Sequence, residues 1–64
     1  MVKINGNELN VAGMTVAEYL ATTDFDCRRI AVERNGEIVL KINYSETVIK
    51  DGDSLEVVSF VGGG

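Results

Sequence analysis

The most distinctive chemistry in the sequence stands at its end, where residues 62–64 are three consecutive glycines. Glycine lacks a Cβ atom, so such a run fits a narrow channel in extended form and reaches about 10 Å at ~3.3–3.6 Å per residue. The group that it delivers is the carboxylate of Gly64. A carboxylate is a poor electrophile, so chemistry on it requires prior activation, most simply as an acyl-adenylate. A frayed chain end without a function is the alternative interpretation.

Cys27 is a competing candidate for sulfur chemistry. It is the one cysteine, and the sequence has no histidine, which excludes internal disulfides, zinc sites of the usual kind and four-cysteine iron–sulfur sites. Arg28 or Arg29 would favour its thiolate modestly, but no histidine is present to activate it. We expect Cys27 to be a small residue beyond a helix. Asp51 and Asp53 indicate turn chemistry, so no metal site is predicted.

Length and composition indicate one small globular domain. The chain has 64 residues and a mass of 6.9 kDa, with 45% hydrophobic and 25% charged residues, which argues against disorder. Its six basic residues are scattered and its net charge is −4, which argues against nucleic-acid binding. The sequence shows neither a run of the ~20 apolar residues that a transmembrane helix needs nor a signal peptide, so we expect a cytoplasmic protein without a membrane partner. We do not expect so short a chain to be an enzyme by itself.

The first Asn-Gly pair predicts a hairpin at the start of the chain. Val2 and Ile4 alternate with polar residues, which is the period of a half-buried strand. Asn5-Gly6 follows, and both residues tolerate the positive φ angles of a type I′ turn. We therefore expect a hairpin over about residues 1–12.

The residues after the predicted hairpin show the spacing of a helix. Thr15 and Glu18 stand three residues apart as a capping box, in which each side chain bonds to the backbone of the other residue. Apolar residues then recur at helical spacing, so one side of this segment should face a core. The pattern predicts a helix over about residues 15–23, which is short enough to need packing against a sheet.

A second Asn-Gly pair, at residues 35–36, predicts another hairpin. Residues 30–34 alternate before this turn, and residues 37–42 form the predicted return strand. Three apolar residues of the return strand are in phase: Ile38, Leu40 and Ile42.

The last predicted strand, residues 55–61, is apolar on both sides. We place Leu55 and Val57 under the helix, which leaves Val58 and Phe60 on the opposite side. One interpretation is a second small cluster closed by loops. The other is a partner-binding patch at Val58 and Phe60, because contiguous exposed apolar surface usually marks a partner site.

The order of elements is strand, strand, helix, strand, strand, short connection, strand. This order predicts an α+β domain with one helix packed across one face of a mixed sheet of about five strands. If the first and last strands are parallel neighbours at the centre, the fold is a β-grasp. We expect the β-grasp domain to span residues 1–61 and residues 62–64 to be a flexible glycine tail.

Several segments of the chain match one known pattern: Ile4–Gly6, Thr15–Leu20, Ala31–Val39, Gly52-Asp53 and Phe60–Gly64. Together they resemble the ThiS family, the sulfur carriers of thiamin biosynthesis within the ubiquitin-like β-grasp superfamily. The resemblance covers the whole chain, and the Gly-Asp turn, the final strand and the terminal Gly-Gly in register are its most specific parts. The chain is also similar to MoaD, the small subunit of molybdopterin synthase. That branch is usually longer and often has prolines before its Gly-Gly, whereas this chain has no proline.

The resemblance implies a carrier cycle at Gly64, with Gly62 and Gly63 giving access. An E1-like adenylyltransferase (ThiF-like) would use ATP and Mg²⁺ to form an acyl-adenylate, so the carrier itself would bind no cofactor. A persulfide sulfur, drawn ultimately from a cysteine desulfurase, would displace AMP and leave a thiocarboxylate. Thiazole synthase (ThiG-like) would then take the sulfur.

Three alternatives stay open beside the carrier in thiamin biosynthesis. The first is a sulfur carrier like the molybdopterin-synthase small subunit. The second is a ubiquitin-like modifier joined through Gly64 to lysines of other proteins, because the same activation chemistry serves both roles. The third is a β-grasp binding module with an inert tail, against which a free Gly-Gly terminus argues.

Overall fold

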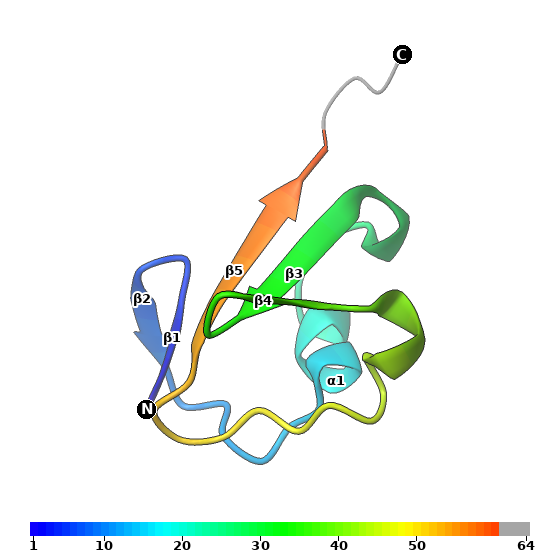
Figure 1. Ribbon diagram of the computed structural model, residues 1–64. Coiled ribbons are helices and arrows are strands. Elements are labelled where there is room, and N and C mark those ends of the chain that lie inside the picture. Colours follow the sequence, from blue (N-terminus) through cyan, green and yellow to red (C-terminus); the bar gives the residue numbers. More distant parts are fainter. Residues whose placement is uncertain (61–64) are drawn as a thin grey trace.

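The computed structural model describes residues 1–60 (Figure 1). The β1–β2 hairpin lies on one side of β5 and the β3–β4 hairpin on the other, with α1 between the two hairpins in the sequence. The elements are β1 (Val2–Ile4), β2 (Asn7–Leu9), α1 (Val16–Ala21), the 3₁₀ turn η1 (Cys27–Arg29), β3 (Ile30–Arg34), β4 (Glu37–Val39), the 3₁₀ turn η2 (Lys41–Asn43) and β5 (Ser54–Ser59).

The strands form a mixed sheet in the order β2-β1-β5-β3-β4. The central strand β5 is parallel to β1, where Ile4 aligns with Leu55. It is antiparallel to β3, where Val32 aligns with Val57. The first and last strands are therefore parallel neighbours at the centre, and the predicted α+β β-grasp fold is confirmed.

Both Asn-Gly turns form as the sequence predicts. Asn5 and Asn35 each have φ of 52°, and the glycines that follow have φ of 84° and 86°, as a type I′ turn requires. The two asparagine side chains also bond to the strand β5. The Asn5 Oδ1 accepts the Val57 N–H at 2.8 Å, and the Asn35 Oδ1 accepts the Ser54 N–H at 2.9 Å. Each turn is thus fixed both by local geometry and by the central strand.

The helix begins with the predicted capping box. The Thr15 Oγ1 accepts the Glu18 N–H at 3.1 Å, and the Glu18 Oε1 accepts the Thr15 N–H at 2.8 Å. The helix ends at Ala21, two residues before the predicted end. There the Thr22 and Thr23 hydroxyls donate to the carbonyls three residues earlier at 2.6 and 2.7 Å, which competes with continued helical bonding.

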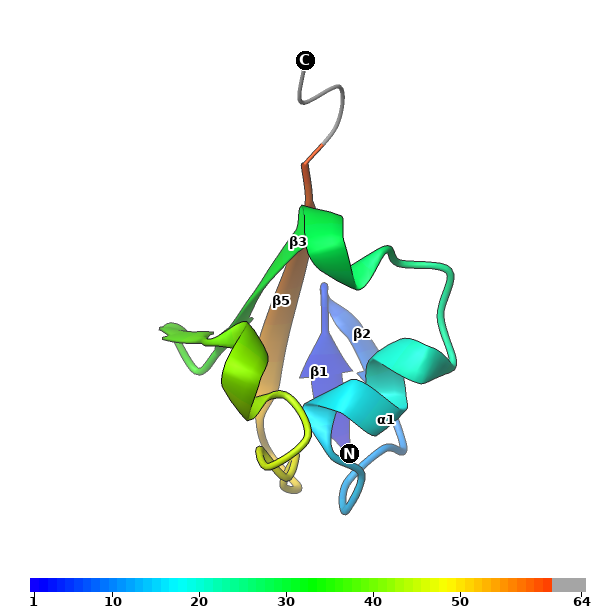
Figure 2. The same cartoon turned by 90° about the vertical axis from the view of Figure 1, so that its right-hand side faces the viewer.

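One hydrophobic core lies between the sheet and the helix. The segment α1 and the turn η2 lie on the same side of the sheet (Figures 1 and 2). The core draws on the inward face of the strands, on one side of α1 and on the connection that leads into β5. Its buried members are Val2, Ile4, Val16, Tyr19, Leu20, Ile30, Val32, Tyr44, Ile49, Leu55 and Val57.

The predicted return strand over residues 37–42 was too long. The strand β4 ends at Val39, which packs against the core, and the chain turns into η2. This turn brings Tyr44 into the core, where its carbonyl accepts the Ala17 N–H at 2.9 Å. Burial of Tyr44 thus outweighs continuation of an edge strand. The three apolar residues in phase are all exposed: Ile38, Leu40 and Ile42.

The end of the predicted last strand lies outside the described residues. The strand β5 covers Ser54–Ser59, and residues 61–64 fall beyond the part of the chain that the structure describes, as does the predicted boundary between domain and tail. Within residues 1–60, no helix has the length and apolar character to cross a membrane.

Candidate functional site

The described chain ends at Phe60, next to η1. The predicted reacting residue Gly64 and its neighbours Gly62 and Gly63 lie outside the described residues. The Phe60 N–H donates to the Arg29 carbonyl at 2.7 Å, which continues the β3–β5 ladder by one pair beyond β5. Phe60, the last described residue, is therefore held against the chain just before β3.

The two residues proposed for partner binding are exposed. Val58 retains 49% and Phe60 56% of its accessible surface, whereas Leu55 and Val57 are buried under the helix. A second small cluster closed by loops is therefore wrong. Strand alternation explains the result, because neighbouring residues of β5 face opposite sides and α1 covers only one of them.

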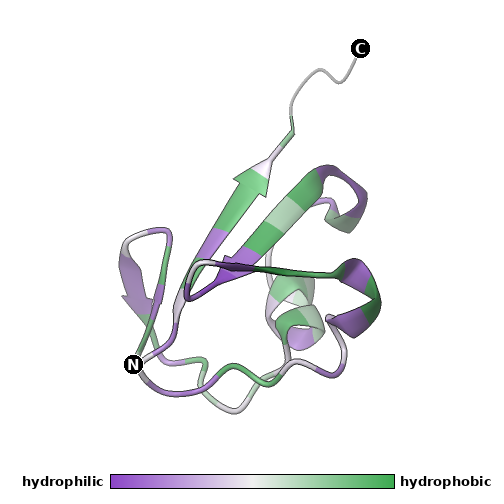
Figure 3. Ribbon diagram, viewed as in Figure 1, coloured by the Kyte–Doolittle hydropathy of each residue, from purple (hydrophilic) through white to green (hydrophobic). Residues whose placement is uncertain are grey.

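The exposed apolar residues gather on the open face of the sheet, the face away from α1. Val58 lies directly opposite Ala31 of β3. On the edge strand, Ile38 is 61% and Leu40 57% exposed. Figure 3 shows hydrophobic segments of β3 and β5 side by side toward the end of β5. We call this set the open-face patch: Ala31, Ile38, Leu40, Val58 and Phe60. In the sequence, Ile38 and Leu40 alternate with Val39. Because Val39 faces the core, this alternation indicates that Ile38 and Leu40 face away from it.

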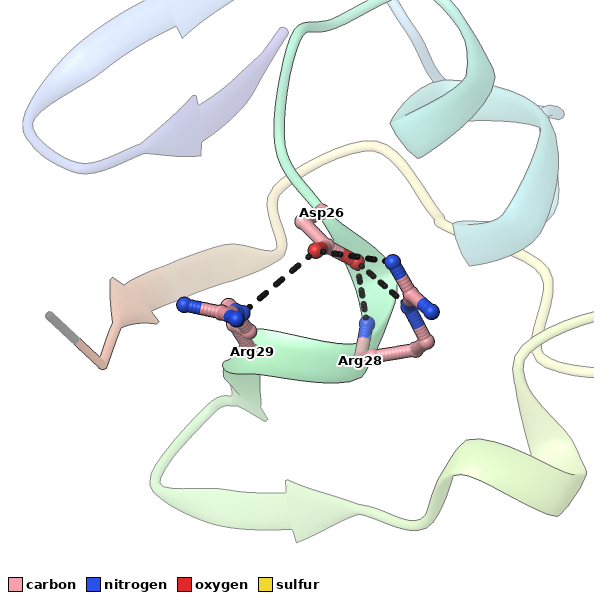
Figure 4. A network of polar contacts seen from close by, with 3 residues as sticks. All are labelled: Asp26, Arg28 and Arg29. Carbon is pink, nitrogen blue, oxygen red and sulfur yellow. Dashed lines mark hydrogen bonds and ion pairs between the residues drawn. The ribbon is translucent and has the colours of Figure 1, made fainter. Parts of the chain in front are cut away.

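A small charged cluster lies next to the base of the tail (Figure 4). Asp26 accepts the Arg28 N–H at 3.0 Å and the Arg28 Nε at 3.3 Å, and its other oxygen lies 3.7 Å from the Arg29 Nε. The backbone hydrogen bond from Arg28, followed by its side chain, lowers the pKa of Asp26. The arginine side chains remain 89% and 66% exposed, so they present positive charge to solvent.

Cys27 is exposed and free at the start of η1. It lies beyond the helix, as predicted. Burial, and secondarily the nearby charge of Cys27, raise the pKa of Tyr44 above its ordinary 10.0, so this phenol stays protonated at neutral pH and offers no base. The chain has no histidine to act as a base for the thiol.

Asp53 has a structural role, as its position in a predicted turn indicates. Its carboxylate accepts the Arg34 Nε at 2.8 Å, the Asn35 Nδ2 at 3.0 Å and the Lys50 N–H at 2.9 Å. Burial alone would raise the pKa of Asp53, but these bonds outweigh it and the pKa is lowered. In the described part of the chain, no group of three histidine, cysteine, aspartate or glutamate residues is placed to hold a metal.

Beside β4 lies a shallow hollow of about 260 Å³. It is open to solvent and mixes apolar and polar side chains, so it does not enclose a small molecule in the way that a typical ligand pocket does. Its lining consists of Arg34, Glu37, Ile38, Val39, Leu40, Asn43 and Thr47. The candidate docking surface of residues 1–60 is thus the open-face patch with the charged cluster beside it.

Known proteins match this chain over nearly its whole length. The model of the ThiS family matches residues 2–64. The sulfur carrier protein ThiS of Bacillus subtilis is 36% identical over 66 residues, which covers 100% of both chains. The crystal structure of the thiamine biosynthesis protein ThiS from Geobacter metallireducens superposes with a TM-score of 0.78 at 33% identity, over 98% of this chain and 97% of the other.

A further relative is a much longer protein. The thiazole synthase of Paramagnetospirillum magneticum is 52% identical over 62 residues, which is 95% of this chain but 19% of the relative. The thiazole synthase of Magnetococcus marinus is matched over 20% of its length. The chain therefore spans about a fifth of these relatives.

Proposed function

The chain belongs to the ThiS family, and from this premise we propose that it is a sulfur carrier of thiamin biosynthesis that reacts at Gly64. One observation carries the proposal: this chain and a sulfur carrier protein ThiS align over the full length of both, and the family match extends through residues 62–64. In this role the chain is a co-substrate of its partner enzymes and does no catalysis by itself.

Activation converts the Gly64 carboxylate into an electrophile. One carboxylate oxygen attacks the α-phosphorus of ATP on a ThiF-like adenylyltransferase, and pyrophosphate leaves. ATP and Mg²⁺ belong to that partner, so the carrier supplies only the acyl group. The acyl-adenylate then holds a good leaving group, AMP, at the former carboxylate carbon.

Sulfur enters by substitution at that carbon. The terminal sulfur of a persulfide, drawn ultimately from a cysteine desulfurase, attacks the acyl carbon and AMP leaves. A thiol then attacks the other sulfur of the acyl disulfide, which breaks the S–S bond and leaves a disulfide and the Gly64 thiocarboxylate. The thiocarboxylate donates its sulfur to the growing thiazole.

Covalent geometry limits where the activating enzyme binds. Four residues follow Phe60, and an extended chain of four spans at most about 13–14 Å. An enzyme that acts on Gly64 must therefore reach close to Phe60 and Arg29. Val58 and Phe60 are exposed at this place, which supports their role in partner binding.

Thiazole synthase is the proposed consumer of the sulfur. Two relatives named thiazole synthase carry a segment like this chain as about a fifth of their length, which supports a partnership between the two activities. We propose a ThiG-like enzyme as this partner. We also propose that the carrier works in the cytoplasm, together with the ThiF-like and ThiG-like enzymes.

The mass of the protein isolated from its own cells tests the proposal. Replacement of one oxygen by sulfur at Gly64 marks a carrier, whereas a covalent adduct with another protein marks a modifier. A chain that continues past Gly64 in the cell, with no processing, would refute the proposal, because the carboxylate would not exist. Transfer of sulfur to thiazole synthase rather than to molybdopterin synthase then separates the two carrier branches.

Reconstitution with the purified adenylyltransferase gives the second test. Deletion of Gly64, or extension beyond it, should abolish adenylation and leave the circular dichroism spectrum unchanged. Normal adenylation of a protein that ends at Gly63 would contradict the assignment.

A further inference from the structure

Two glutamates face each other on the open face of the sheet. Glu33 of β3 lies directly opposite Glu56 of β5 in the antiparallel register. Because Leu55 and Val57 point into the core, Glu56 points away from it, and Glu33 shares its face. Side chains opposite each other in such a pair stand about 4.5–5.5 Å apart at their Cβ atoms.

The described residues do not compensate this pair. Among residues 1–60 the ion pairs formed involve Asp26, Asp51 and Asp53, and neither Glu33 nor Glu56 takes part in one. Like charges directly opposite each other destabilise a sheet. The register therefore places two like charges opposite each other on the open face of the free protein.

The surrounding cations are placed elsewhere. Lys3 of β1 is on the same face but lies opposite Glu8 and aligns with Ser54, not with Glu56. Arg34 is bound to Asp53. Arg29 lies in η1, before the other end of β3, where its carbonyl binds the Phe60 N–H.

The open face thus has a polarity along β5. From the base of the tail, the first cross-strand row is Arg29 with Phe60, the second is Ala31 with Val58, and the third is Glu33 with Glu56. Positive charge, apolar surface and negative charge follow one another. Figure 3 shows the same change from hydrophobic to hydrophilic along the adjacent strands β5 and β3.

We propose that Glu33 and Glu56 together receive one basic side chain of the activating enzyme, whose apolar surface covers Val58 and Phe60. The proposal rests on the function proposed above. An arginine fits best, because its planar guanidinium donates to two carboxylates at once. The contact between this basic side chain and the two glutamates fixes the direction in which the enzyme lies along β5, so that its active site faces the tail.

A second copy of the chain fits this face less well. Of the cations near its own open face, Arg29 already lies 3.7 Å from Asp26 and Lys3 lies opposite Glu8. Such a dimer would also cover Phe60, next to the tail that the enzyme must reach. A partner with its own basic residue does not have these conflicts.

The test uses Glu56→Gln and Glu33→Gln, with Glu46→Gln as the matched control. Glu46 is an exposed glutamate in the connection that leads to β5, so its replacement makes the same change of charge and shape outside the open face. Each variant is measured for its thermal midpoint and for its KM and kcat as the substrate of the adenylyltransferase, at low and high salt.

Removal of either glutamate of the pair should raise the thermal midpoint, because it relieves a repulsion, and should raise KM about tenfold with kcat unchanged. The salt dependence of KM should weaken at the same time. Glu56→Lys should increase stability further, by an attractive pair with Glu33, and should weaken binding further. A gain in stability combined with a loss of binding is not expected of a merely structural role.

The experiment distinguishes failure of the proposed function from failure of the role of the glutamate pair. If the wild-type protein is not adenylated, the proposed function fails, and this inference with it. If the wild-type protein is adenylated and the KM of Glu56→Gln and Glu33→Gln equals that of Glu46→Gln, the glutamate pair alone is refuted. A wild-type dimer in solution that Glu56→Gln dissociates would also refute it, in favour of a second copy.

Discussion

The Nε of Arg34 lies 2.8 Å from the Oδ2 of Asp53, and this ion pair joins the β3–β4 hairpin to the turn before β5. The arginine side chain retains 29% and the aspartate side chain 10% of its accessible surface. The same carboxylate also accepts bonds from Asn35 and Lys50. One side chain thus holds the β3–β4 hairpin against the turn that leads into β5.

Asp53→Ala should destabilise the protein by about 2–3 kcal/mol, because it leaves charged and polar donors without their partner. In a domain of this size the thermal midpoint should fall by roughly 10 °C or more. Asp51→Ala is the control: this acid belongs to the same turn but is 76% exposed and binds the amino group of Met1. Surface pairs of this kind contribute little. Equal melting curves for both variants would contradict the role of Asp53.

Stability should also fall in acid in a way that depends on Asp53. Its pKa is lowered in the folded protein, so its contribution is fully present above its ordinary value of 3.8 and is lost as the pH falls through the lower folded value. Urea denaturation at a series of pH values below about 5 measures this. The slope should be smaller in Asp53→Asn. An unchanged slope would show that other carboxyl groups cause the acid sensitivity.

Phe60→Ala should weaken binding of the adenylyltransferase far more than it weakens folding. A side chain that is 56% exposed contributes little to the core, whereas an aromatic anchor in an interface contributes ~2 kcal/mol or more, about thirtyfold in affinity. Ile42→Ala is the control, since Ile42 is 81% exposed in η2 and outside the open-face patch. Binding by calorimetry and urea denaturation measure the two effects. Loss of stability without loss of binding would remove Phe60 from the docking surface.

Gly63→Val should slow activation strongly at unchanged stability. A β-branched side chain widens the tail and excludes backbone conformations that glycine adopts. The rate of pyrophosphate release with the adenylyltransferase measures the effect, and the urea midpoint confirms the fold. A rate equal to that of the wild-type protein would argue against passage of the tail through a narrow channel.

Cys27→Ser should still form the thiocarboxylate, because the sulfur is proposed to reside on Gly64 and the thiol has no activating base. The thiol is exposed, so the change in stability should be small. Intact mass after reconstitution measures sulfur transfer, with the variant lacking Gly64 as the negative control. A folded Cys27→Ser protein that forms no thiocarboxylate would move the chemistry to the thiol.

Local features of the fold could be predicted from the sequence because they depend on neighbours in the chain. Asn5-Gly6 and residues 35–36 adopt the positive φ angles that their types allow, and Thr15 and Glu18 close a capping box three residues apart. The order of these elements was compatible with the β-grasp topology, and the family resemblance selected it. The glycine run and the family resemblance pointed to chemistry at Gly64.

Only the tertiary structure decided which apolar residues are exposed and which charges meet. Alternation shows that Val57 and Val58 face opposite sides, but the position of α1 decides that Val58 is exposed. The end of β4 at Val39 follows from the burial of Tyr44. Glu33 and Glu56 are 23 residues apart in the sequence and become neighbours only through the register of β3 and β5. Local bonding fixes turns and caps, whereas strand register and burial depend on the packing of distant segments, and the surface for a partner arises from that packing.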